Sequence, residues 1–398
     1  MTERDPRDTP PILMIVDRLI PADGGLFHAV RGISMALAQA GTRVHLLAVA
    51  HDDTRLPPDT PGLTTQLVPR ATGRFARLVA SALREAVRGW ARQHPGGVAH
   101  IHGIWRPEIH AACVAARRAG LPVMVTTHSM LMPWSLRQKW LKKRIAGLLY
   151  QWRDLRRVQL LHATSPAEAE GTRASGFTRV PLAMVPNGVD RPPAATHDTV
   201  VAEGDHTRRI LFLSRLHPGK RPLDLIDAFA RVNPPPAWKL VIAGVDSGGH
   251  GQRLRQAIAA HGIGDRVELI SPLDDDAKWD VYRTAALFVL PTANESFGLA
   301  IAEAMRCGLP VITTRGAPWA AIDREQCGRW IDHGVEPLTA ALRELIALGD
   351  DERRAMGERG RAYVESEFSW GAAADRTSEL YQWLAGHVER PDSVSPPE

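Results

Sequence analysis

Short apolar runs alternate with segments of helical periodicity along most of the chain. Ile12–Val16 is apolar, a loop ending in Gly24-Gly25 follows, and residues 26–40 have helical spacing before the next apolar run, Val44–Val49. Runs of this length are typical of buried strands, and the order strand, loop, helix, strand is typical of a doubly wound α/β domain. The opening of the chain therefore predicts a parallel sheet with helices packed on it.

The alternation continues on both sides of a polar stretch near residue 200. In the first half, further strands are expected at 98–101, 123–127, 158–163 and 182–185. In the second half, strands are expected at 210–213, 240–243, 266–270, 287–290 and 311–313, with helices near 221–232, 250–261, 275–285, 298–307, 336–348 and 351–366. The repeated pattern predicts the α/β class with two domains.

The length of 398 residues is enough for two domains that each bury a core. The segment 186–190 has turn composition, and residues 191–207 are rich in Pro, Thr and Asp, which is typical of a linker. We expect a disordered leader at 1–10, an N-terminal domain at 11–190 and a C-terminal domain at 208–367. A terminal helix at 368–387 is expected to pack back towards the N-terminal domain, before a disordered, Pro- and Ser-rich tail at 388–398.

Composition excludes several classes of protein. The charged fraction of 23% and the hydrophobic fraction of 44% are ordinary for a globular protein, and the net charge of +5 is modest. Three cysteines at unrelated spacings indicate neither a disulfide framework nor a metal motif, which favours a reducing compartment. A charged N-terminus without a signal peptide and the lack of a membrane-length apolar run predict a cytoplasmic protein. Peripheral association with the inner face of the plasma membrane stays open.

Positive charge is concentrated in one segment of the first half. Between residues 137 and 157, eight Lys and Arg residues accompany a single acid, Asp154, and large apolar residues are interleaved from residue 134 onwards. This pattern is typical of helices that bind membrane surfaces or polyanions, so an anionic membrane is a candidate partner of 137–157. The alternative is a solvated helix whose aromatic residues pack on the domain. A nucleic-acid partner is not expected, because the rest of the chain has no recognition module.

A strand-to-helix turn after residue 290 carries two carboxylates. The apolar run stops at Pro291, a polar loop follows, and helical spacing begins near Leu299, so Glu295 and Glu303 bracket the turn. Gly298 permits a ligand to approach the backbone closely, and the amides of a helix N-terminus suit a diphosphate. Glu295 could then bind sugar hydroxyls, and Glu303 could reach a ribose. The alternative is an ordinary N-cap at the turn and a solvated glutamate in the helix.

Other candidate residues follow strands, where open α/β sheets bind their ligands. His102 and His128 end two strands of the first half, and Gly24-Gly25 precedes its first helix without forming the dinucleotide fingerprint. Arg215 and Lys220 follow the first strand of the second half and could neutralise a departing diphosphate. The alternatives are structural histidines, a plain glycine turn and surface cations.

Together, in this order, the pieces resemble the retaining glycosyltransferases of family 4, which have the GT-B fold of two Rossmann-like domains facing each other across a cleft. The resemblance extends from about residue 11 to residue 386. It is carried by Gly24-Gly25, Pro186-Asn187-Gly188-Val189-Asp190, Arg215 with Lys220, the Glu295–Glu303 spacing that is similar to an E-x7-E motif, and Phe368-Ser369-Trp370.

A narrower resemblance is to bacterial members that build exopolysaccharide or lipopolysaccharide. His102-Gly103-Ile104-Trp105 and the segment 128–136 are similar to their HGLW and HGMLxPW motifs. One departure is Ser129, where glycine is common in these relatives. Another is Gly219-Lys220-Arg221, where many have Lys-Lys-Gly, so Arg221 competes with Lys220 for the phosphate-binding role.

The resemblance implies transfer of a sugar from a nucleoside diphosphate sugar, with retention, to a hydroxyl acceptor in cell-surface polysaccharide synthesis. It implies neither a metal nor a cofactor beyond this co-substrate, so Asp274-Asp275-Asp276 is expected to begin a helix. The implied acceptor is a glycan or a polyprenyl-diphosphate-linked acceptor. The alternatives are a GT-B epimerase or hydrolase of the nucleotide sugar, and a non-catalytic protein that binds it.

The resemblance also implies roles for individual residues. Glu303 is expected to hold the donor's ribose, Glu295 its sugar hydroxyls, and Arg215 and Lys220 its leaving diphosphate. Backbone amides around Phe297, Gly298 and Leu299 would assist. In the first domain, His128 would contact the sugar near the reacting carbon, and Gly24, Gly25, His102 and Asn187 would complete the substrate-binding set.

Overall fold

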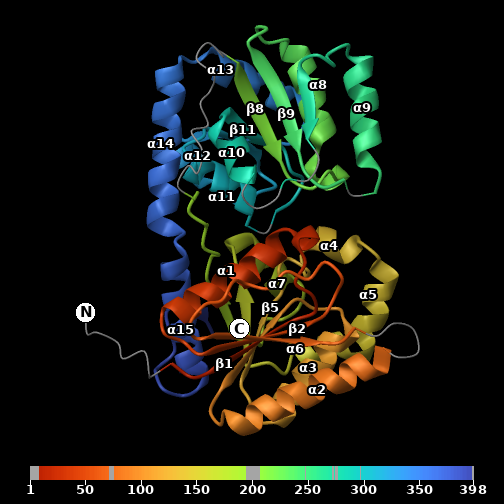
Figure 1. The fold of residues 1–398 in the computed structure, drawn as a ribbon, viewed down its shortest axis with the longest axis vertical. Helices are drawn as coiled ribbons and strands as arrows, with labels where there is room; N and C mark the ends of the chain where they lie inside the picture. Colours follow the sequence, from red (N-terminus) through yellow and green to blue (C-terminus); the bar gives the residue numbers. More distant parts are fainter. Residues whose placement is uncertain are drawn as a thin grey trace. The chain divides into compact units, whose positions relative to one another are not determined.

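A computed structural model of the protein describes residues 9–70, 76–193, 207–246, 248–270, 273, 277–295 and 297–396. The chain forms two compact units, each built on its own sheet (Figure 1). Unit 1 comprises Met1–Gly188 and Trp370–Glu398, and unit 2 comprises Val189–Ser369. Residues 1–8 of the leader expected at 1–10, and residues 194–206 of the linker expected at 191–207, lie outside the described residues.

Unit 1 contains an eight-stranded sheet in the order β14-β7-β6-β5-β4-β1-β2-β3. All neighbouring strands are parallel except β14 and β7. Parallel strands with helices on both faces are buried, which accounts for their continuous apolar sequences. The bounds are β1 Ile12–Val16, β2 Val44–Val49, β3 Leu63–Val68, β4 Val98–His102, β5 Val123–Thr126, β6 Leu160–Ala163, β7 Leu182–Met184 and β14 Val394–Ser395.

Helices cover this sheet, and several begin with proline, whose fixed φ and missing amide suit the first helical turn. Their bounds are α1 Gly25–Gln39, α2 Ala76–Gln93, α3 Pro107–Arg118, α4 Pro133–Arg137, α5 Trp140–Ala146, α6 Trp152–Leu155, α7 Pro166–Ala174 and α15 Trp370–Leu384. A 3-10 turn at Pro21–Asp23 precedes α1, and a π-helix at Gly147–Gln151 lies between α5 and α6.

Three features of unit 1 differ from the sequence-based expectations. The tail expected to be disordered contains β14, which pairs with β7 and buries Val394. The strand β3 was not predicted, because its central residues are polar and exposed as an edge strand allows. The basic segment is two helical pieces rather than one helix, because the extended backbone of Gln138 and the left-handed one of Lys139 separate α4 from the continuous run of α5, the π-helix and α6.

The terminal helix α15 packs on α1 within unit 1, and Trp370 makes this contact close. A Cβ atom added to Gly32 of α1 would lie 2.1 Å from the Trp370 ring, and one added to Gly188 would lie 2.3 Å from it. The indole of Trp370 therefore fits only because Gly32 and Gly188 have no Cβ atom. The helix begins at Trp370, and Phe368 and Ser369 belong to unit 2.

Unit 2 contains a six-stranded parallel sheet in the order β10-β9-β8-β11-β12-β13. Its strands are β8 Arg208–Leu213, β9 Trp238–Ala243, β10 Val267–Ile270, β11 Ala285–Leu290, β12 Val311–Thr314 and β13 Gly328–Ile331. Its helices are α8 Pro222–Val232, α9 His250–Ala260, α10 Ala277–Arg283, α11 Leu299–Arg306, α12 Ala321–Arg324, α13 Val335–Ala347 and α14 Asp350–Glu367, with a 3-10 turn at Pro218–Lys220. The strand β13 was not predicted, and Asp274-Asp275-Asp276 lies outside the described residues.

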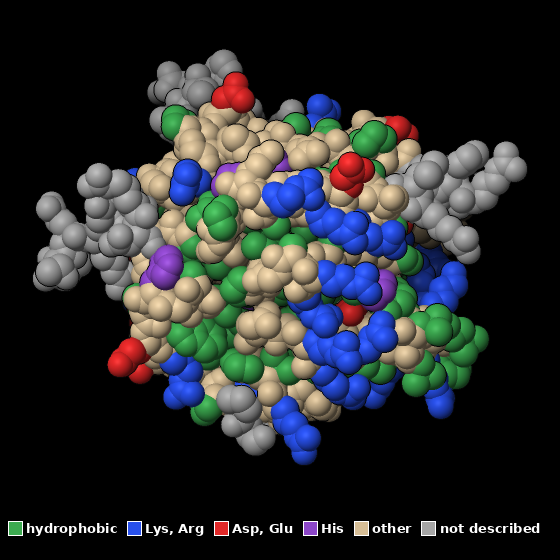
Figure 2. All heavy atoms as spheres, turned by 90° about the horizontal axis from the view of Figure 1, so that it is seen from below, with side chains coloured by type: hydrophobic (Ala, Val, Ile, Leu, Met, Phe, Trp, Pro, Cys, Tyr) green, Lys and Arg blue, Asp and Glu red, His purple; other side chains and the backbone are tan. Residues whose placement is uncertain are grey.

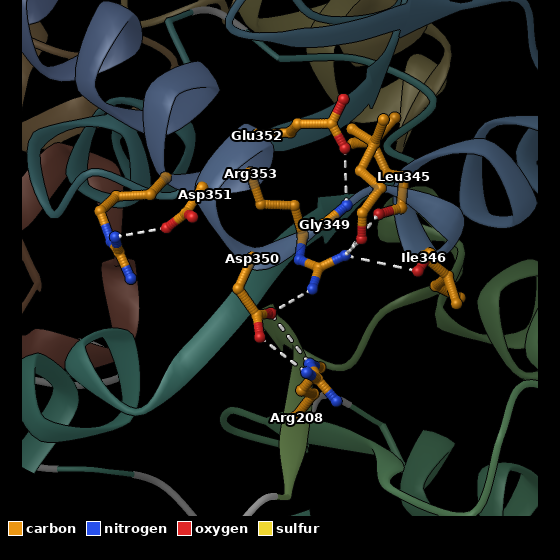
Figure 3. Close-up of polar contacts among 10 residues, drawn as sticks. Arg208, Leu345, Ile346, Gly349, Asp350, Asp351, Glu352 and Arg353 are labelled. Carbon is orange, nitrogen blue, oxygen red and sulfur yellow. Dashed lines mark hydrogen bonds and ion pairs between the residues drawn. The ribbon is translucent and has the colours of Figure 1, made fainter.

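An arginine network joins the first residue of β8, a central strand of this sheet, to the α13–α14 turn (Figure 3). Buried Arg353 donates to the carbonyls of Leu345 and Ile346 at 3.2 and 3.3 Å, which satisfies the end of α13. It also pairs with Asp350, which receives two further hydrogen bonds from Arg208 of β8 at 3.0 and 2.7 Å. Hydrogen bonds from Arg208 and Arg353 hold the pKa of Asp350 below its ordinary value.

The Trp370 contact predicts opposite effects for two helical Gly→Ala substitutions. Gly89→Ala in α2 should raise the free energy of unfolding by about 1 kcal/mol, because alanine favours helix and only Arg92 lies within 4 Å of the new Cβ. Gly32→Ala should lower it, because the methyl group would overlap Trp370. Urea unfolding of both variants measures the difference. Equal stabilisation by both substitutions would contradict the packing described for α15.

Candidate active site

In unit 2, the loops after β8 and β11 are bound to each other. The carbonyl of Gly219 accepts hydrogen bonds from the amide of Ala293 at 2.8 Å and from the hydroxyl of Thr292 at 3.3 Å. These bonds place Lys220 beside Glu295, and the ammonium donates to the carboxylate. Both side chains are 14% exposed, so the pair is shielded but open to a ligand. Two residues predicted independently from the sequence are thus direct neighbours.

Glu303 lies on α11 and is buried, with two partners from α10. Lys278 donates to it at 2.8 Å, and the Tyr282 hydroxyl donates at 3.1 Å. A buried carboxylate requires such partners, because an unpaired charge is very costly in the interior. Burial, with the Glu303 charge, raises the pKa of Tyr282. Sequence reasoning missed Lys278 and Tyr282, although their i, i+4 spacing could have placed them on one helix face.

The turn before α11 depends on Gly298. Its φ of 84° is left-handed, and an added Cβ would lie 3.0 Å from Ile301 and 3.2 Å from Trp319. Phe297 is buried, with its ring 5.3 Å from that of Trp319. Only its backbone can serve the predicted binding role. Leu299 is the first residue of α11, where helix amides have no intrahelical partner.

The cations after β8 lie in different surroundings. Arg215 is exposed, and Arg221 pairs with Asp224 of α8 at 3.1 Å. Burial, and then the charge of Arg215, lowers the pKa of His217. Because Lys220 contacts Glu295 and Arg221 is paired elsewhere, Lys220 is the better placed of the two for the predicted phosphate role.

In unit 1, the N-terminus of α1 leaves Gly24 and Gly25 uncovered. Gly24 has φ 58° and ψ −119°, a conformation that residues with a Cβ avoid. A Cβ added at either position would find no atom within 4 Å. The first glycine is therefore required by the backbone, and the open space at both leaves the helix N-terminus accessible.

Four histidines line a pocket of unit 1: His100, His102 and His162 are buried, and His128 is partly exposed. The pocket is lined by Ala29, Ile33, His100, His102, Thr126, His128, His162, Val185, Pro186, Asn187, Trp370, Ala373 and Thr377. His102 Nδ1 lies 3.0 Å from His128 Nε2. The other nitrogen of His102, Nε2, is buried and has no hydrogen-bond partner among the residues described. The predicted residues His102, His128 and Asn187 are thus brought to one pocket.

Two of these histidines, not identified from the sequence, belong to a one-directional chain of hydrogen bonds. His162 Nε2 must donate to the carbonyl of Val185 at 2.9 Å, which leaves its Nδ1 to accept from the Thr126 hydroxyl at 2.7 Å. Thr126 then accepts from His100 Nε2, and His100 Nδ1 accepts from the Tyr381 hydroxyl, both at 2.7 Å. The two links in which an Nδ1 atom accepts, at His162 and His100, require a neutral imidazole.

Burial accounts for the electrostatics of the histidine cluster. It lowers the pKa of His100, His102 and His162, and it lowers the pKa of His128 to about 4 against the opposing charge of Glu168. Among the described residues, no group of three or more His, Cys, Asp or Glu side chains is placed to hold a metal ion. Most of the cluster's ring nitrogens bind one another or neighbouring residues, and His102 Nε2 is the exception described above.

Family models match both halves of the chain. Residues 24–188 match the model "Glycosyl transferase 4-like domain", and residues 196–363 match "Glycosyl transferases group 1". A D-inositol 3-phosphate glycosyltransferase of Xylanimonas cellulosilytica is 29% identical over 90% of this chain and 91% of that protein. The enzyme of the same name from Corynebacterium jeikeium is 37% identical, over 46% of this chain and 45% of its own length.

Solved structures share the fold. Sucrose-phosphate synthase from Thermosynechococcus elongatus has a TM-score of 0.74 at 21% identity, covering 95% of this chain and 100% of that one. Anabaena HepE in complex with UDP and glucose has a TM-score of 0.73 at 18% identity, covering 93% and 99%. At these identities the likeness establishes the GT-B fold of two parallel-sheet α/β domains.

The neutral histidine cluster predicts loss of stability in mild acid. Because the folded-state pKa values lie below 6.5, the unfolded chain binds more protons below that pH. Stability should therefore be complete above pH 6.5 and fall as the pH drops towards 4. Each such histidine removes about 1.4 kcal/mol per pH unit in that window. Urea unfolding between pH 7.5 and 4.5 measures this slope.

A matched pair of substitutions tests whether the histidine cluster causes this dependence of the free energy of unfolding on pH. His162→Gln keeps a donor and an acceptor in the chain but cannot be protonated, so it should flatten the pH dependence. His261→Gln, at an exposed site paired with Asp227, should leave the slope unchanged. A wild-type slope in His162→Gln would disprove the contribution of the cluster.

Proposed function

The chain belongs to the glycosyltransferases of family 4, and we propose that it transfers a sugar, with retention and without a metal ion, from a nucleoside diphosphate sugar to a lipid-linked glycan. No further cofactor is included in the proposal. The observation that carries it is the pair of Lys220 and Glu295 at the carboxyl ends of β8 and β11, with Glu303 held on the adjoining helix. Ligands of parallel sheets bind at this edge.

The residues of unit 2 supply complementary contacts for such a donor. Lys220, Arg215 and the first amides of α11 provide positive charge for the diphosphate, whose negative charge increases as it departs. Glu295 orients Lys220 and has a carboxylate to accept hydrogen bonds from sugar hydroxyls. Glu303, fixed by Lys278 and Tyr282, can accept from the ribose hydroxyls without a further conformational cost.

Retention is proposed to occur by same-face substitution. The bond from the anomeric carbon to the diphosphate oxygen breaks, the acceptor oxygen bonds to the same face, and its proton passes to the departing phosphate oxygen. The proposal does not use Glu295 as a nucleophile, because its carboxylate accepts a hydrogen bond from Lys220. The neutral imidazole of His128 is available for a hydrogen bond to the transferred sugar.

An exposed surface of unit 1 supports a lipid-linked acceptor. The apolar–basic surface is formed around α5 and the π-helix, beginning at α4. Leu148 is 77% exposed and Leu149 is 70% exposed, which is unusual for large apolar residues. Its members are the exposed Trp134, Trp140, Leu141, Ile145, Leu148 and Leu149, with the exposed cations Arg137, Lys139, Lys142 and Arg144. This composition fits an anionic membrane.

Figure 2 shows exposed hydrophobic side chains beside a dense group of lysine and arginine side chains on one face. Some members of the basic segment contact other parts of unit 1 and do not belong to the apolar–basic surface. Tyr150 donates to the carbonyl of Trp105, Trp152 packs on Phe177, and Lys143 donates to Ser135. None of the described helices has the length and apolar character needed to cross a bilayer, so the proposal is peripheral binding. Location on the inner face of the plasma membrane is part of the same proposal.

A second acceptor class has specific support. The relatives reported above are named for transfer to D-inositol 3-phosphate, and one of them aligns over 90% of this chain. A phosphorylated cyclitol is therefore the competing acceptor. Product analysis with each acceptor class, after a thermal-shift screen of UDP and GDP sugars, separates the two. Consumption of the donor without an acceptor would instead indicate an epimerase or hydrolase.

The donor-site proposal predicts that Glu295→Gln and Lys220→Met each lower kcat on the order of 100-fold, because each removes charge aimed at the reacting donor. Radiolabelled sugar transfer measures the loss. Glu344→Gln, which breaks the exposed pair with Arg329 in the same unit, is the control and should retain activity. The anomeric proton coupling of the product tests retention, and addition of EDTA tests metal independence. Wild-type turnover by Glu295→Gln, with native circular dichroism, would remove this residue from the site.

The membrane proposal predicts that Leu148→Ser/Leu149→Ser and Lys142→Glu/Arg144→Glu each weaken binding to anionic vesicles. The first pair removes apolar burial, and the second reverses the attraction, which added salt should also screen. Flotation with vesicles that contain or lack anionic lipid measures binding. Lys239→Glu/Arg253→Glu reverses two exposed charges of unit 2 and is the matched control. Unchanged flotation of both surface variants would disprove the proposal.

A further inference from the structure

The turn that carries His128 has a backbone conformation that its residues disfavour. His128 has φ 47° and Ser129 has φ 61°, so two consecutive residues with a Cβ are left-handed. Such strain persists only where the surrounding structure determines the conformation. Glycine would adopt the φ of Ser129 freely, whereas serine does not. Because this protein has serine at position 129, other contacts must stabilise the turn.

Glu168 binds the turn on both sides of His128. It lies on α7 and is 1% exposed. Its Oε1 accepts hydrogen bonds from the Thr127 hydroxyl at 2.8 Å and from the Ser129 amide at 2.5 Å. A buried carboxylate forms strong, charge-assisted hydrogen bonds with such donors. The two contacts bracket His128 and leave its imidazole unbound by Glu168.

The remaining contacts of Glu168 fix the carboxylate itself. Its Oε2 accepts from both the amide and the hydroxyl of Thr164, each at 2.8 Å. Its own amide donates to Ser165, the N-cap of α7, at 3.2 Å. Four donors therefore hold the carboxylate from the end of β6 and from the turn. The start of α7 and the His128 turn are joined through one side chain.

We propose that Glu168 is a positioning residue, which holds the His128–Ser129 turn left-handed and so places the His128 imidazole for the transfer reaction. This inference rests on the proposed function, since it takes His128 as the group that contacts the sugar. Glu168 itself contacts neither substrate. Its contribution is to keep the imidazole in place before a substrate binds, which lowers the cost of reaching the reactive arrangement.

Two substitutions separate the turn from the helix cap. In Glu168→Gln the charge is lost, which weakens the hydrogen bonds at both Ser129 and Thr164, and the amide nitrogen cannot accept, so one of these two backbone amides loses its partner. Ser129→Gly removes the strain of a positive φ and favours the turn without Glu168. The double variant should thus regain the turn but not the contacts at Thr164. Glu170→Gln, exposed on the same helix, is the matched control.

The expected result is a kcat about 10-fold lower in Glu168→Gln with an unchanged donor Kd. Hydrogen exchange, followed by mass spectrometry, should accelerate in peptides covering 127–132 and 164–170. In Glu168→Gln/Ser129→Gly, kcat and exchange at 127–132 should return towards wild type, while exchange at 164–170 stays fast. Thr127→Val removes the hydrogen bond from the Thr127 hydroxyl to Glu168 and should also lower kcat. This variant replaces Glu168→Gln in the test if Glu168→Gln does not fold.

Wild-type kcat and exchange in Glu168→Gln would overturn the proposal. Failure of Ser129→Gly to restore either quantity, with native circular dichroism, would also overturn it and assign Glu168 to the helix cap alone. The exchange measurement needs no substrate. If the wild-type protein transferred no sugar but exchange followed the expected pattern, the turn assignment would be supported and the proposed function would fail.

Discussion

The parallel pairing of β8 with β11 is the constraint on which the candidate donor site depends. Neighbouring parallel strands release their loops at the same edge, and the Gly219–Ala293 hydrogen bond joins those loops directly. Lys220 and Glu295, 75 positions apart in sequence, meet only because of this pairing. Either side chain alone at the site would be a poorly compensated charge, so their contact also stabilises the empty site.

The buried side chains of His100 and His162 in unit 1 are also compensated by partners, but here the partners are neutral groups. The hydrogen-bond chain through His100, Thr126 and His162 satisfies the imidazoles in one direction, and it extends to Tyr381 on the terminal helix. Apolar surroundings disfavour protonation of these rings, and the chain leaves no acceptor for an added proton. The pocket is thus held as a rigid neutral surface that includes His128.

Three glutamate carboxylates, one in unit 1 and two in unit 2, are fixed by hydrogen bonds. Glu168, Glu295 and Glu303 each accept hydrogen bonds from residues outside their own element before any ligand is bound. This preorganisation avoids rearrangement during binding, and at Glu168 it also maintains a strained turn. The three sites differ in accessibility: Glu168 is enclosed, whereas Glu295 can contact a ligand.

Local patterns in the sequence were sufficient to predict two α/β units, the strand-to-helix turn at Gly298 and the spacing of Glu295 and Glu303. Periodicity and turn chemistry depend on neighbouring residues, so the sequence states them directly. Only the tertiary structure decided that Lys278 holds Glu303, that Glu168 holds the turn after β5, and that the tail forms a strand. These contacts join segments far apart in the chain, and their formation depends on strand register and packing that a one-dimensional pattern does not specify.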